Sequence, residues 1–75
     1  MTEIIRISTP FIKLDQFLKF SGIVEMGCDA KFLVQEGYVM VNGETELRRG
    51  KKLVPGDKVF VDYEGQQFSL EVEKE

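Results

Sequence analysis

The chain has 75 residues, of which 43% are hydrophobic and 31% charged, and its formal net charge at pH 7 is −3. This composition is typical of a small soluble domain and excludes a disordered chain, which would hold too few apolar residues to form a core. With one cysteine, Cys28, and no histidine, we expect no internal disulfide, no metal site, no cofactor and a reduced, cytoplasmic monomer. The first residues resemble neither a signal peptide nor a membrane span, so no membrane association is expected.

The first half of the chain predicts a strand followed by two short helices. The β-branched residues of segment 4–7 favour a strand, which ends before Pro10. Apolar residues then recur at helical spacing over 13–21 and again over 28–36, and a glycine follows each segment. Helices this short are marginal alone, so each must dock its apolar face on another element.

The second half of the chain changes to the alternating pattern of strands. Segments 39–41 and 44–47 flank Asn42-Gly43, a strong hairpin signal because both residues accept positive φ. Two further strands, 59–63 and 68–73, follow the Pro-Gly of the next turn. We therefore predict an α+β fold in which two short N-terminal helices pack on a small, mostly antiparallel β-sheet, within a single domain spanning 1–75.

Basic and acidic residues are unevenly distributed along this chain. Residues 1–59 hold nine Lys/Arg against eight Asp/Glu, whereas 60–75 hold one against five. Four cations lie within the five residues 48–52, namely Arg48, Arg49, Lys51 and Lys52. Such a patch creates its own potential within a Debye length of roughly 8 Å. It indicates an anionic ligand, and the alternative is a solvated turn whose charges only maintain solubility.

Polar side chains on the predicted helices extend this basic loop. They are Lys13, Gln16 and Lys19 of the first helix and Lys31 of the second. The helix stripes and the loop together would form one face for an anion. Phe20 and Phe32 lie away from the apolar helix faces, where they either stack unpaired bases or pack, on each other or on the strands, as a satellite cluster.

Catalytic groups are absent from this pattern. Cys28 has no histidine to activate it, and therefore more plausibly fills space at a helix start. The carboxylate pairs alternate along predicted strands, at positions where solvent-facing side chains are expected. We therefore expect a protein that is not an enzyme.

Four stretches occur in a characteristic order: 13–18, 27–31, 36–44 with Val-Asn-Gly, and 53–59 with Pro-Gly-Asp. Over residues 11–63 the chain resembles the RNA-binding domain named after ribosomal small-subunit protein four, also called the alpha-L motif. It is most similar to the stand-alone bacterial YbcJ/YaaA-like proteins. The resemblance implies non-catalytic binding of structured RNA, ribosomal or transfer RNA, with a possible place of action on the ribosome.

The resemblance also carries over to single positions. Lys13 matches the basic residue that opens the first helix, Lys31 lies in the exposed part of the second, and 48–52 matches the basic loop. Many members have Ser-Arg where this chain has Gly27-Cys28, so their linker arginine is absent here.

Two other functions remain open at this point. A β-grasp sulfur carrier or ubiquitin-like protein can have similar length and turns, but it reacts through a C-terminal Gly-Gly. The sequence ends instead in Val-Glu-Lys-Glu, and its helices come too early for that fold. A protein-interaction module that uses the acidic segment 62–75 is the other alternative.

Overall fold

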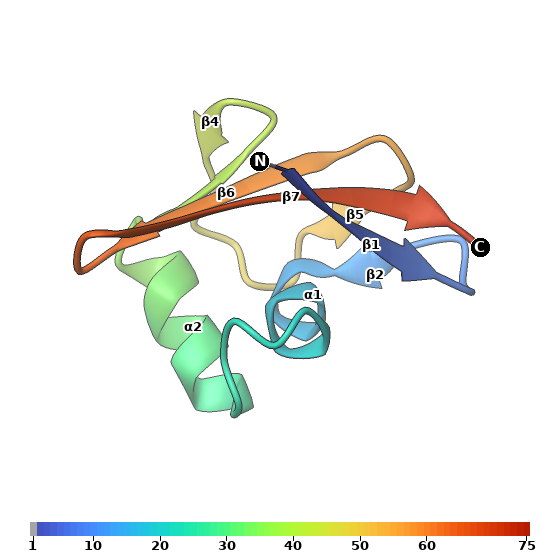
Figure 1. Ribbon diagram of the computed structural model, residues 1–75. Helices are drawn as coiled ribbons and strands as arrows, with labels where there is room; N and C mark the ends of the chain where they lie inside the picture. Colours follow the sequence, from blue (N-terminus) through green and yellow to red (C-terminus); the bar gives the residue numbers. More distant parts are fainter. Residues whose placement is uncertain (1) are drawn as a thin grey trace.

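Two helices cover one face of a five-stranded sheet in the computed structural model, which describes residues 2–75 (Figure 1). The helices are α1 (Leu14–Phe20) and α2 (Gly27–Gln35). The strands are β1 (Thr2–Ile7), β2 (Ile12–Lys13), β3 (Val39–Val41), β4 (Glu44–Thr45), β5 (Lys52–Leu53), β6 (Lys58–Tyr63) and β7 (Gln66–Lys74). The predicted α+β architecture is thus confirmed.

The main sheet has the strand order β1-β7-β6-β3-β4. All neighbours are antiparallel except β1, which runs parallel to β7 with Ile5 opposite Val72. The strand predicted over 44–47 is shorter in the structure, because β4 ends at Thr45, although the backbone N–H of Glu46 still donates to the carbonyl of Val39 in β3 at 3.0 Å. Strands β2 and β5 form a separate two-stranded sheet that the sequence did not predict.

Two hairpins use two-residue turns with both central residues in the left-handed region. Asn42 and Gly43 have φ values of 53° and 86°, and Glu64 and Gly65 have values of 50° and 77°. This is the backbone of a type I′ turn, whose twist matches that of the strands it joins. The predicted Asn-Gly hairpin between β3 and β4 is confirmed.

A hydrogen-bond network joins the Asn-Gly turn to the Pro-Gly-Asp turn. The side-chain amide of Asn42 donates to Asp57 Oδ1 at 3.1 Å, and the backbone N–H of Lys58 donates to Asn42 Oδ1 at 2.9 Å. The backbone N–H of Val54 donates to Asp57 Oδ2 at 2.9 Å. The two sequence motifs therefore form one structural unit, which holds both ends of the segment between them in place.

The core lies between the helices and the inner face of the sheet. Its fully buried side chains come from every layer, and the largest is Phe17 of α1. The others are Leu14, Leu18, Val34, Val39, Leu53, Val59, Val61, Leu70 and Val72. Within residues 2–75, neither helix is long and apolar enough to cross a membrane.

Candidate nucleic-acid interface

Pairing of β2 with β5 docks the basic loop, residues 48–52, against the start of α1. Lys13 lies opposite Lys52 in this antiparallel pair. The first helical N–H groups then donate to loop carbonyls, Leu14 to Lys51 at 2.8 Å and Asp15 to Arg49 at 3.0 Å. Because these amides are already satisfied by the loop, an anion here must be bound by side chains.

The strand pair and the two backbone hydrogen bonds bring the cations of this region close together. Lys13, Arg49 and Lys52 are exposed, and Lys51 is half-buried. Like charges directly opposite each other, as at Lys13 and Lys52, destabilise a strand pair. A phosphate placed between them would relieve that repulsion.

Phe11 adds an aromatic surface that sequence reasoning missed. Its side chain is 40% exposed, and the Nζ atom of Lys52 lies 4.8 Å from the ring centroid. This cation–π contact leaves part of the ring open to a ligand. No periodic pattern marks Phe11, because it precedes a strand of only two residues. Its only sequence signal is an aromatic residue two positions before Lys13.

Arg48 differs from the other cations of the loop. Its Nε donates to Glu46 Oε2 at 2.9 Å, and its Nη2 donates to Oε1 of the same carboxylate at 3.1 Å. The backbone N–H of Arg48 also donates to that carboxylate, at 3.1 Å. Hydrogen bonding to Arg48 holds the pKa of Glu46 below its usual range, so the carboxylate stays charged. The loop therefore presents three unpaired cations and one paired one among the described residues.

The helix residues of the predicted face are exposed but less tightly gathered. Gln16 and Lys19 lie on α1, directly beyond the docked loop, and Lys31 lies on α2. Among residues 2–75, no hydrogen bond or ion pair joins Lys31 to the loop. The structure thus places Lys13 with the loop, while a role for Lys31 stays a prediction.

The two phenylalanines singled out as stacking candidates have different environments. Phe32 is 47% exposed, and its ring lies 6.0 Å from that of Tyr38 and 5.9 Å from that of Tyr63, between centroids. This matches the satellite-cluster alternative. Phe20, at the end of α1, is 62% exposed, so its ring is open to solvent.

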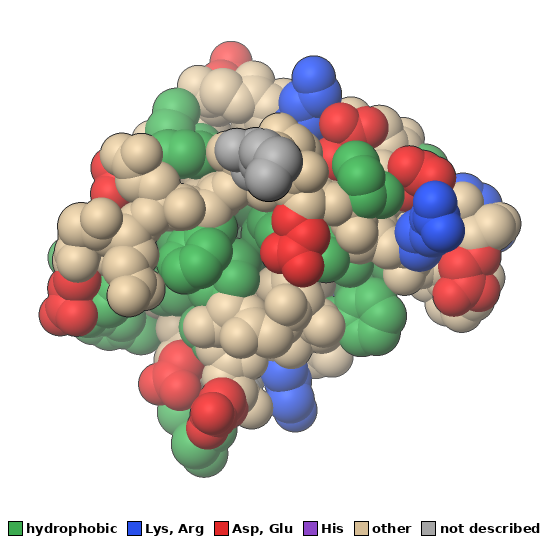
Figure 2. All heavy atoms as spheres, viewed as in Figure 1, with side chains coloured by type: hydrophobic (Ala, Val, Ile, Leu, Met, Phe, Trp, Pro, Cys, Tyr) green, Lys and Arg blue, Asp and Glu red, His purple; other side chains and the backbone are tan. Residues whose placement is uncertain are grey.

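Charge is unevenly distributed on the surface. In the view of Figure 2, Lys and Arg side chains appear at the top, the right and the bottom, and acidic side chains lie beside those at the top and the right. The left part of the same face, around the hairpin of β6 and β7, shows acidic and hydrophobic side chains instead. On the visible face the two signs of charge are therefore mixed, except around the β6–β7 hairpin.

Comparison with known proteins gives the family. The S4 domain model matches residues 5–71. "Probable ribosome maturation protein RlbA" of Bacillus subtilis is 42% identical over 62 residues, covering 83% of this chain and 87% of that protein. "Putative RNA-binding protein YbcJ" of Escherichia coli is 40% identical over 50 residues, covering 67% and 71%.

A solved structure agrees with this assignment. The solution structure of YbcJ from E. coli, described as revealing an alpha-L motif involved in RNA binding, matches with a TM-score of 0.58 and 32% identity. The match covers 92% of this chain and 84% of that one. The chain therefore belongs to the S4 domain family.

Proposed function

We propose that this protein binds structured RNA through the surface formed by the basic loop and α1. The observation that carries the proposal is the docking of the loop on α1, which sets Lys13 opposite Lys52 and beside an exposed aromatic ring. Family membership and the name of the relative from Escherichia coli, a putative RNA-binding protein, support RNA as the anion. The protein acts by binding and not by catalysis.

Two kinds of contact follow from this geometry. Flexible ammonium groups and Arg49 neutralise phosphates, which positions the RNA without reading its sequence. The face of Phe11 accepts an unpaired base, since stacking on an aromatic side chain requires no specific base. A ligand that offers both is a folded RNA with a bulge or loop, rather than a continuous duplex.

Ribosomal RNA is the ligand that we propose, with transfer RNA as the alternative. The support is the relative from Bacillus subtilis, whose name refers to ribosome maturation. The two ligands are separated by crosslinking the protein to RNA in cells and sequencing what is bound. Enrichment of ribosomal RNA is the expected result. Enrichment of transfer RNA would contradict it and identify transfer RNA as the ligand.

A matched pair of double variants tests the surface. Arg49→Ala/Lys52→Ala removes one arginine and one lysine from the proposed surface, and Arg6→Ala/Lys74→Ala removes the same charges from the β1–β7 edge. Affinity for ribosomal RNA should fall about tenfold or more for the first pair and little for the second. The slope of log K against log salt should also decrease by about two for the first pair only. Equal losses would show a general field effect and contradict the proposed surface.

A further inference from the structure

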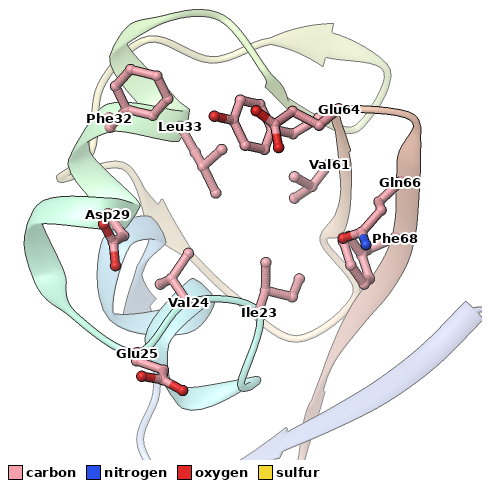
Figure 3. A pocket seen from close by; sticks show the side chains of 11 residues that line it. Ile23, Val24, Glu25, Asp29, Phe32, Leu33, Val61, Glu64, Gln66 and Phe68 are labelled. Carbon is pink, nitrogen blue, oxygen red and sulfur yellow. The ribbon is translucent and has the colours of Figure 1, made fainter.

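A pocket of about 420 Å³ lies away from the basic loop, between α2, the linker that follows α1, and the hairpin of β6 and β7 (Figure 3). Its apolar lining includes Ile23, Val24, Leu33, Val61 and Phe68. This volume falls within the range of about 300–1,000 Å³ that is usual for ligand sites. It is large enough for an apolar side chain with part of its backbone.

Three carboxylates surround this apolar lining. Glu25 comes from the linker, Asp29 from the first turn of α2 and Glu64 from the β6–β7 turn, and all three are exposed. No Lys or Arg is among the residues that line the pocket. The charge here is thus opposite to that of the basic loop, and it would repel the phosphates of an RNA.

The position of Glu64 is unusual for a long side chain. Its φ of 50° is in the left-handed region, where Asn, Asp or Gly is preferred in a two-residue hairpin turn. The neighbouring Tyr63 also lines the pocket, and burial, followed by the charge of Glu64, raises the pKa of its phenol. The hydroxyl therefore keeps its proton and can donate a hydrogen bond at neutral pH.

We propose that this pocket binds a cationic segment of a partner protein, which inserts one apolar side chain and places its Lys or Arg residues beside the three carboxylates. The carboxylates come from three separate segments, so a ligand must carry separated positive charges around an apolar group. A basic peptide has this chemistry. The inference goes beyond RNA binding and does not depend on it, because it uses a different surface.

Three synthetic peptides test the proposal on the full chain by changes in amide NMR resonances. The first is acetyl-Lys-Arg-Leu-Phe-Arg-Lys-amide, the second replaces its Leu and Phe by serine, and the third replaces its four cations by glutamate. The first should shift the resonances of Val24, Leu33 and Val61 in a saturable way, while the other two bind at least about tenfold more weakly, since both charge and anchor are needed. Equal binding of the serine peptide would contradict the proposal that an apolar side chain enters the pocket.

A matched pair of triple variants then tests whether the three pocket carboxylates supply the charge that attracts the peptide. Glu25→Gln/Asp29→Asn/Glu64→Gln removes the three pocket carboxylates and should weaken binding of the first peptide about tenfold, because each exposed ion pair contributes a small factor. The control, with the same charge change on other surfaces, should weaken it less than about twofold. Its substitutions are Glu3→Gln, Glu44→Gln and Glu75→Gln. Equal effects of the two triple variants, or RNA shifting the same resonances as the peptide, would overturn the proposal.

Discussion

The basic loop packs against the start of α1, whereas the acidic pocket forms beyond its end, and the two regions are built in different ways. Backbone hydrogen bonds and one short strand pair hold the loop, so its cationic side chains other than Arg48 stay free for a ligand. The pocket is instead a gap between apolar side chains of three segments. One small core thus supports two surfaces of opposite charge, and the net charge of −3 describes neither.

The largest effect is expected where the core anchors the basic loop. Leu53 of β5 is fully buried directly after the loop, so Leu53→Ala should lower the free energy of unfolding by about 2–5 kcal/mol. That is a large share of the stability of a domain this small. Urea denaturation measures it, with the neighbouring Val54→Ala as control, since Val54 is 47% exposed. Similar losses for both would contradict the anchoring role of β5.

The network between the two turns should have the next largest effect on stability. Asn42→Ala removes two side-chain hydrogen bonds and replaces a residue that tolerates positive φ by one that adopts it less readily, which together should cost about 2–3 kcal/mol. Asn42→Gly loses the same hydrogen bonds but accepts the φ, so it should cost about 1 kcal/mol less. Thermal unfolding of both variants separates the cost of the lost hydrogen bonds from the cost of the left-handed backbone. If glycine were the more harmful replacement, the left-handed backbone would not be the reason for asparagine here.

Stacking at the basic loop is expected to affect RNA affinity by about 1–3 kcal/mol. Phe11→Ala removes a ring that lies under Lys52, at the proposed phosphate surface, whereas Phe20→Ala removes a more exposed ring at the far end of α1. RNA titration should therefore show a loss of about 5- to 150-fold for the first variant and a smaller one for the second. A larger loss for Phe20→Ala would move the stacking site to the end of α1.

The sequence predicted most of the fold because its signals are local. Helical spacing, the Asn-Gly turn and the alternating strands each reflect contacts between residues near in sequence, and the structure has all of them. The β2–β5 pair could not be predicted in this way. It joins Ile12 to Leu53 through two residues on each side, too few for any periodic pattern. The docking of the loop on α1 therefore became visible only in three dimensions.

The candidate site was predictable in its residue types but not in its balance of charges. Counting four cations in five residues treats them as equal, although Glu46 pairs with one of them. Glu46 lies two positions before Arg48, near the end of the strand predicted over 44–47, so only their closeness in sequence could have indicated the pair. The pocket was even harder to predict from the sequence, because its carboxylates come from segments separated by up to half the chain.

The smallest predicted effect concerns this paired arginine. Glu46→Gln removes the charge that holds Arg48, so RNA affinity should rise, by about two- to fivefold as for other exposed ion pairs. Glu44→Gln removes the same charge from β4, where no described hydrogen bond or ion pair of residues 2–75 involves its side chain. A similar gain for both would show that only the general field changed.

The dependence of this gain on pH follows from the lowered pKa of Glu46. A carboxyl group whose pKa is lower in the folded protein adds stability above its unfolded pKa and loses it as pH falls through the folded value. The ion pair thus persists at every pH above the usual glutamate range of about 4.3. The difference in RNA affinity between wild type and Glu46→Gln should stay constant from about pH 8 to about pH 5 and decrease only below that. A difference that already disappears at about pH 6 would mean that the pKa of Glu46 is raised and not lowered, which would contradict the pair with Arg48.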